Sequence, residues 1–145
     1  MTETLPDAEI AARLRLSATR LARRLRQEGG TGLTPSQLSA LAAVHNHGPL
    51  TLGELADHER VAPPSITKVV GKLEQEGLVA RTPDAADRRV HRVATTKAGE
   101  ALIAETRRRK TTWLTGRVRE LDPADQARLA GALDVLDQLC GQEPR

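Results

Sequence analysis

Residues 49–96 contain four pieces of regular structure in an order that few small folds share. Two short helical patterns come first, separated by a turn at 58–61, and a glycine at position 77 ends the second pattern. Two strand patterns follow, at 78–81 and 90–93, and the residues between them include two consecutive arginines. This order predicts a pair of angled helices followed by a β-hairpin that extends beyond them.

Capping signals mark where the first helices begin. The run Thr34-Pro35-Ser36-Gln37 supplies an N-cap residue, a proline at the first helical position and a glutamine that completes a capping box. Gly48-Pro49 ends this helix, and residues 50–52 have a short, extended pattern. Thr51 and Glu54 form a second capping box, which predicts that a short helix begins there.

The next helix begins at Pro63-Pro64 and divides into two faces. Apolar residues recur at positions 66, 69, 70 and 73, the spacing of a helix that docks on a core by one side. The other side carries short polar and cationic groups, which suit base edges and phosphates in the major groove of DNA. The candidate contacts on this helix are Pro63, Pro64, Ser65, Thr67, Lys68 and Lys72.

The expected hairpin tip reads Asp84-Ala-Ala-Asp87-Arg88-Arg89. Arginines at the end of a β-ribbon reach beyond the domain, where the potential of a narrow minor groove attracts them. We expect Asp87 to pair with Arg89 or Arg88 and to fix the tip's shape. The sequence therefore predicts a winged helix-turn-helix. The candidate wing contacts are Asp87, Arg88, Arg89 and Arg92, and further candidates for phosphate contacts are Ser36, Thr51, Arg60 and Arg81.

Three longer helical patterns lie outside this unit. Apolar residues repeat at positions 14, 18, 21 and 25 within residues 7–27, and at 129, 133, 136 and 140 in the last helix. A third helix is expected from a cap at 95 or 96 to about residue 120. A winged helix alone cannot cover these stripes, so a second copy of the chain is expected to do so. We predict a mainly α fold with a small β-wing, in which a winged helix-turn-helix at 31–96 is flanked by dimerisation helices at 1–30 and 97–145.

Residues 35–99 resemble the MarR family of bacterial winged helix-turn-helix transcription regulators. The segment at 60–65 resembles an actinobacterial branch in particular, whereas the family usually has Leu where Ala94 or Thr95 stands. The segments that carry the resemblance are Thr34-Pro35-Ser36-Gln37-Leu38, Ser65-Ile66-Thr67-Lys68, Lys72-Leu73-Glu74, Gly77-Leu78-Val79-Ala80-Arg81, Asp87-Arg88-Arg89 and Thr95-Thr96-Lys97-Ala98-Gly99.

The resemblance implies an obligate homodimer in which the first helix and the last two helices of both subunits interleave. Each subunit then presents one winged helix to successive major grooves of a palindromic operator in double-stranded DNA. It also implies a repressor that releases DNA when a small ligand, commonly an aromatic acid or phenol, binds between the two regions. The expected function is therefore that of a dimeric, sequence-specific transcriptional regulator.

Composition and charge argue against several other classes. Residues 60–110 hold 12 Lys and Arg against 6 Asp and Glu, so basic charge gathers where the winged-helix pattern lies. One Trp and no Phe or Tyr leave little for stacking unpaired bases, which disfavours single-strand binding. One cysteine excludes an internal disulfide, and we expect a cytoplasmic protein without a signal peptide or membrane span. We expect no enzyme activity, catalytic residue, cofactor or metal site, because the corresponding motifs are missing.

Two alternative functions remain open at this point. A winged helix used only for protein interaction would not require the cations at 68, 72, 88 and 89. A redox sensor acting through Cys140 would require a lowered thiol pKa, and no cationic neighbour is evident, so an inert buried or terminal thiol is expected. His45 falls on the stripe of residues 38 and 41, which favours a core or interface histidine. Trp113 is expected to be a hydrophobic anchor rather than part of a ligand cleft.

Overall fold

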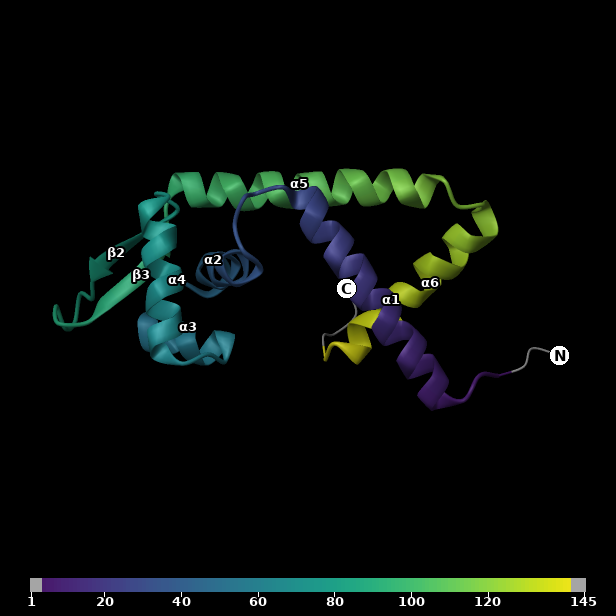
Figure 1. Ribbon diagram of the computed structural model, residues 1–145, viewed down its shortest axis with the longest axis horizontal. Helices are drawn as coiled ribbons and strands as arrows, with labels where there is room; N and C mark the ends of the chain where they lie inside the picture. The colour runs from purple at the N-terminus through teal and green to yellow at the C-terminus, as the bar shows by residue number, and fades with distance from the viewer. Residues whose placement is uncertain (1–3, 142–145) are drawn as a thin grey trace.

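The structure is a computed structural model that describes residues 4–141 of the chain. A compact head built from α2, α3, α4 and a small sheet lies at one end, and α5 runs from this head to the other end, where it forms an extended arm with α1 and α6 (Figure 1). The predicted mainly α fold with a β-wing is confirmed. The elements are α1 (Asp7–Gly29), α2 (Pro35–His47), β1 (Leu50–Thr51), α3 (Leu52–Glu59), α4 (Pro63–Gln75), β2 (Val79–Pro83), β3 (His91–Thr95), α5 (Lys97–Arg119) and α6 (Pro123–Leu139).

Both predicted capping boxes are present. The Thr34 hydroxyl accepts the amide of Gln37 at 3.2 Å, and the Gln37 side chain accepts the amide of Thr34 at 3.0 Å. Thr51 and Glu54 form the same reciprocal pair at the start of α3, with distances of 3.1 and 3.4 Å. The hydroxyl of Thr96 caps α5 by accepting the amide of Gly99. These local contacts explain why the helix starts were predictable from sequence.

The sheet has three antiparallel strands in the order β1-β3-β2. Leu50 pairs with Val93, and Val79 pairs with Thr95. Two residues of the stretch at 50–52, which was expected only to be extended, form β1, whereas Leu52 begins α3. Both wing strands begin one residue later than expected. Strand boundaries depend on which backbone groups find partners across the sheet, and the residue pattern of one strand does not specify that.

The core of the head lies between α2, α3, α4 and the sheet. Its largest fully buried side chains are Leu41, Leu55, Ile66, Val70, Leu73 and Val93. The expected stripe of α2 is only partly correct, because Leu38 and Ala42 are half-buried while Ala40, Ala43 and Val44 are buried. Helices α3, α4 and α5 and strand β3 all contact α2, so this helix buries more than one side.

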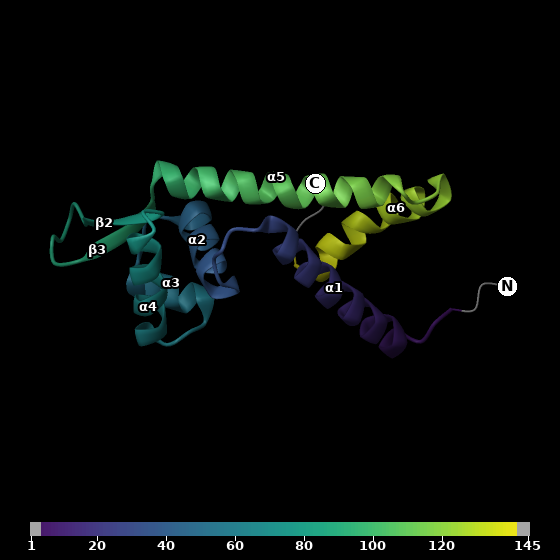
Figure 2. The ribbon, with the colours of Figure 1, turned by 45° about the horizontal axis from the view of Figure 1, so that its top comes forward.

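The arm leaves its apolar faces uncovered within the chain. Helix α1 packs on α5 only near its C-terminal end, where Gly29 is its one buried residue (Figure 2). In α6 no residue is buried, and Leu133 and Leu139 are 53% and 66% exposed. One expectation is corrected here. His45 is exposed rather than part of the core, because it lies on the side of α2 that faces away from the head's interior. Cys140 is exposed at the end of α6, which agrees with the terminal rather than the buried alternative for this thiol.

Candidate nucleic-acid interface

Helix α4 presents the expected polar face to the outside of the head. Ile66, Val70 and Leu73 are buried, and this fixes the rotation of the helix about its axis. The helix begins with two prolines after Ala62, which makes no side-chain cap. The residues on its exposed side include every predicted contact: Pro63, Pro64, Ser65, Thr67, Lys68 and Lys72.

The two lysines of α4 differ in their surroundings. Lys72 Nζ lies 3.2 Å from Glu76 Oε1, one turn further along the same exposed face. Lys68 is exposed and forms no ion pair with any acidic side chain of residues 4–141. Thr67 donates its hydroxyl hydrogen to the carbonyl of Pro63 at 3.0 Å, so its oxygen remains available only as an acceptor. Of the two lysines of α4, Lys68 is therefore the one whose ammonium group is not paired with a carboxylate of the described residues.

The wing tip carries a preformed aspartate–arginine pair. Arg89 donates from Nε to one oxygen of Asp87 at 3.1 Å and from a terminal nitrogen to the other at 3.3 Å. The Arg89 guanidinium holds the pKa of Asp87 below its usual value. The Arg89 side chain is nevertheless 91% exposed, and the neighbouring Arg88 is also exposed. The expected pairing at the tip thus exists, and both arginines face solvent.

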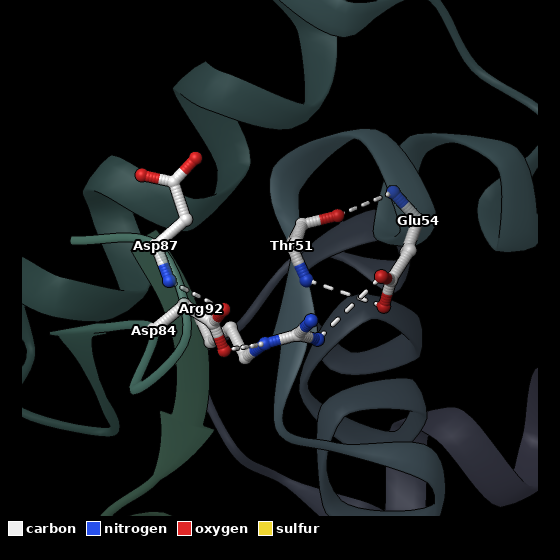
Figure 3. A network of polar contacts seen from close by, with 5 residues as sticks. All are labelled: Thr51, Glu54, Asp84, Asp87 and Arg92. Carbon is white, nitrogen blue, oxygen red and sulfur yellow. Dashed lines mark hydrogen bonds and ion pairs between the residues drawn. The ribbon is translucent and has the colours of Figure 1, made fainter. Parts of the chain in front are cut away.

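The base of the wing contains a polar network that sequence reasoning missed (Figure 3). Arg92 donates from Nε to Asp84 Oδ1 at 2.9 Å and from a terminal nitrogen to Glu54 Oε1 at 3.5 Å. The hydrogen bond from Arg92 is the main reason that the pKa of Asp84 is lowered. Arg92 was expected to meet the DNA backbone, but it is committed to two carboxylates of its own chain. Glu54 was interpreted only as a capping residue, and Asp84 as part of the tip.

The four further phosphate candidates fall into two groups. Ser36, in the first turn of α2, and Ser65 of α4 line the same surface hollow of about 320 Å³. Arg60 is exposed at the turn between α3 and α4, where its backbone is left-handed with φ 55°. The Thr51 hydroxyl already accepts the amide of Glu54 in the capping box, and Arg81 Nε lies 2.7 Å from Glu74 Oε1. Ser36 and Arg60 are therefore better placed for an external partner.

A small cavity lies between α2 of the head and α5 of the arm. It measures about 80 Å³ and includes Thr106 of α5, whose buried hydroxyl oxygen has no hydrogen-bond partner in the described part of the chain. Glu105, beside it, accepts hydrogen bonds from Arg108 and Arg109, which lower its pKa to about 2. Arg109 also donates to the carbonyl of Gly30, which ties α5 to the end of α1. The cavity is lined by Leu38, Ala42, Ile103, Thr106, Arg107 and Lys110.

The remaining candidates lie apart from this surface. Trp113 is half-buried, with the Arg24 guanidinium 5.4 Å from its ring centroid, so it anchors α1 on α5. The rings of His47 and His58 have their centroids 4.6 Å apart. Among residues 4–141, no group of three or more His, Cys, Asp or Glu side chains is placed to hold a metal ion. No helix in that range has the length and apolar character needed to cross a membrane.

Comparisons with known proteins agree with this geometry. The model of the MarR family matches residues 33–91. The HTH-type transcriptional regulator Mb0904 of Mycobacterium bovis is 37% identical over 139 residues, which cover 95% of this chain and 97% of that protein. The crystal structure of a transcriptional regulator from Pseudomonas aeruginosa has 32% identity and a TM-score of 0.84, with 97% of this chain and 100% of that chain covered.

A further structural likeness carries the family name. The structure of a MarR family protein from Bacillus stearothermophilus aligns with a TM-score of 0.77 and 27% identity, covering 96% of this chain and 100% of that one. The likeness thus includes the arm as well as the head. Together with the exposed cationic faces of α4 and the wing, these matches identify the chain as a member of the MarR family of DNA-binding, non-enzymatic transcription regulators.

Proposed function

We propose that the chain forms a homodimer that binds a palindromic operator in double-stranded DNA and represses transcription. The observation that carries the proposal is the presence of two exposed cationic elements on one head. Lys68 on α4 is unpaired among the described residues, and Arg88 and Arg89 are exposed in the loop between β2 and β3, the wing that extends from the same head (Figure 1). A helix of this kind suits the major groove, and a cationic ribbon beside it suits the minor groove.

The uncovered arm supports the dimer. Large apolar side chains of both α1 and α6 are exposed in the single chain, and exposed apolar faces of this extent favour association with another molecule. They are Ile10, Leu16, Leu21, Leu129, Leu133, Val135 and Leu139. We assign residues 1–30 and 97–145 to dimerisation and residues 31–96 to DNA binding. Two α4 helices held about one helical turn apart, ~34 Å, would meet successive major grooves. A structural neighbour, a mutant of MepR from Staphylococcus aureus, was solved with a bound oligodeoxyribonucleotide; at 19% identity it supports the fold.

The sign of regulation has two candidates. The repressor MdtR of Bacillus subtilis is 39% identical over 74 residues, which include half of this chain. The activatory protein BadR of Rhodopseudomonas palustris is 32% identical over 108 residues, about two thirds of this chain. We favour repression because a dimer seated on a promoter excludes polymerase without any further contact. Activation needs a surface that binds polymerase, and it is the second candidate.

A small anionic ligand is the proposed release signal. The cavity between head and arm combines apolar walls with an unpartnered buried hydroxyl on Thr106 and two cationic side chains, Arg107 and Lys110. An aromatic acid combines an apolar ring with a carboxylate, which suits the chemistry of this lining, but the cavity of about 80 Å³ must widen to admit it, because ligand pockets usually measure about 300–1,000 Å³. Binding there would change the angle between α5 and α2 and hence the spacing of the two α4 helices. Oxidation of Cys140 is the alternative signal, and a Cys140→Ser variant that still responds to the inducer would exclude it.

The test is selection of DNA fragments from the genome by the purified full-length protein. We expect enrichment of a palindromic site, bound in a gel-shift assay as one complex that contains two chains. A reporter placed behind the enriched promoter then distinguishes repression from activation. If no duplex is enriched even in dilute buffer, the chain is better described as a winged helix used for protein interaction.

A further inference from the structure

The side chain of Arg92 joins three separate segments of the head. The residue lies on β3, and the antiparallel register places it opposite Thr51 of β1. Its guanidinium contacts Asp84 in the wing loop at 2.9 Å and Glu54 in the first turn of α3 at 3.5 Å. The Arg92 side chain is only about one third exposed, at 34%. Its donors therefore point toward the protein's own carboxylates.

The two carboxylate oxygens of Glu54 accept hydrogen bonds from two different groups. One oxygen accepts the backbone amide of Thr51 and completes the capping box of α3, while the other accepts Arg92 (Figure 3). A carboxylate held by the start of a helix is a fixed point on the head, since its own position is set by backbone geometry. Arg92 thus connects the wing to α3, and α3 packs directly on α4.

Asp84 links Arg92 to the tip of the wing. One of its oxygens accepts Arg92, and the other accepts the backbone amide of Asp87 at 3.2 Å. The amide of Asp84 also donates to the carbonyl of Val90 at 2.7 Å, which closes the base of the loop. Asp87 in turn holds Arg89. A continuous series of polar contacts therefore runs from the first turn of α3 to the arginine at the end of the wing.

We infer that Arg92 is a positioning residue, which acts with Asp84 and Glu54 to set the angle between the wing and α4. The inference rests on the proposed DNA binding and changes the expected role of Arg92 from a phosphate contact to a brace. Two carboxylates beside a DNA-binding surface weaken its attraction for phosphates. The presence of Asp84 and Glu54 is explained if they hold the wing so that Arg88 and Arg89 reach the minor groove while α4 lies in the major groove.

The direction in which one substitution changes the affinity for DNA distinguishes an electrostatic effect from a positioning effect. Asp84→Asn removes a negative charge near the DNA, so electrostatics alone predicts tighter binding. Positioning predicts weaker binding, by about tenfold, because the wing arginines lose their fixed place. Asp57→Asn is the matched control, since it makes the same charge change at an exposed site of α3 where the carboxylate has no ion pair among residues 4–141.

The affinity is measured by titrating the full-length dimer into a fluorescent duplex that carries the site enriched from genomic fragments. Asp84→Asn should bind about tenfold more weakly than Asp57→Asn. Arg92→Lys should show a similar loss, because lysine keeps the charge but lacks the planar fork that reaches both carboxylates. In a background that already carries Arg88→Ala and Arg89→Ala, Asp84→Asn should cause no further loss. Equal or tighter binding by Asp84→Asn, or the same loss in both backgrounds, overturns the inference.

A second readout does not require DNA. Trypsin cleaves after Arg88 and Arg89 when the wing opens, so the cleavage rate reports how firmly the wing is held. Asp84→Asn and Arg92→Lys should be cut there several-fold faster than wild type, whereas Asp57→Asn should not. Unchanged rates overturn the brace even if the protein binds DNA. Faster cleavage in a protein that binds no duplex would uphold the brace and reject the proposed DNA binding.

Discussion

Gly29 of α1 lies so close to Thr106 of α5 that a Cβ atom at position 29 would sit 3.2 Å from the Thr106 methyl carbon. This close approach packs the end of α1 against α5 and leaves Thr106 buried, at 4% exposure. The hydroxyl oxygen of Thr106 is left without a partner among the described residues. A buried polar atom of this kind costs free energy unless a ligand satisfies it.

Thr106→Val should therefore stabilise the ligand-free protein by about 1 kcal/mol, because valine has the same shape without the hydroxyl. Thermal unfolding measures the change, and Thr112→Val, at an exposed position of the same helix, is the control. The same variant should lose its response to an aromatic acid in the gel-shift assay. A lower free energy of unfolding for Thr106→Val would show that the hydroxyl has a partner in solution.

Lys68→Ala should weaken operator binding by about 1–3 kcal/mol and relax the preference at one or two base pairs of each half-site. The reason is that Lys68 is the exposed, unpaired donor on the outward face of α4 within residues 4–141. Competition between operator variants measures the preference. Lys97→Ala, at the exposed start of α5, should change neither quantity beyond a small electrostatic loss. An unaltered base preference would exclude Lys68 from the groove.

Arg89→Ala should weaken binding with little change in the preference for bases read by α4. Its guanidinium is 91% exposed at the wing tip, and a minor-groove arginine responds to groove width more than to base identity. The measurement is affinity for operators whose flanking steps are A·T-rich or G·C-rich. The wild type should favour the A·T-rich flank, and the variant should not; a preference that survives the substitution contradicts this role.

Glu105 should make the stability of the arm sensitive to acid. The hydrogen bonds from Arg108 and Arg109 lower its pKa from 4.5 to about 2, so the carboxylate contributes stability above pH 4.5. That contribution is lost as the pH falls from 4.5 toward 2, when the folded protein must take up the proton. Unfolding by urea at several pH values should show the stability difference between wild type and Glu105→Gln shrinking over this interval. Glu100→Gln, on the same helix, is the control, and a difference that is constant with pH would contradict the assignment.

Sequence patterns predicted those features of the molecule that depend on neighbours along the chain. The capping boxes at Thr34 and Thr51, and the stop at Gly77 with its left-handed backbone, were correct because each involves residues within a few positions. The Asp87–Arg89 pair is also local, and it was expected. Such signals also place the exposed face of α4, since periodicity alone separates it from the buried face.

The brace at Arg92 was not predictable in the same way. Its contact with Glu54 spans 38 positions and depends on β1 pairing with β3, which a two-residue strand does not signal. The only hint was the presence of two aspartates, Asp84 and Asp87, in the wing loop, and that pattern is also typical of a solvated loop. The burial of Ala40 and Ala43 and the exposure of His45 follow from three helices and a strand meeting α2, which is a tertiary property.

Leu133→Glu tests whether the uncovered face of α6 is the dimer contact. The residue is 53% exposed in the single chain, so the charge should leave the fold of the subunit intact. Buried against a second copy, the same carboxylate costs several kcal/mol, enough to separate the subunits at micromolar concentration. Sedimentation should then give the mass of one chain, 15.7 kDa, and operator affinity should fall sharply because one head makes half the contacts. Ala124→Glu, at an exposed position on the opposite side of α6, should remain a dimer that binds DNA. A dimeric Leu133→Glu protein would place the contact elsewhere on the arm.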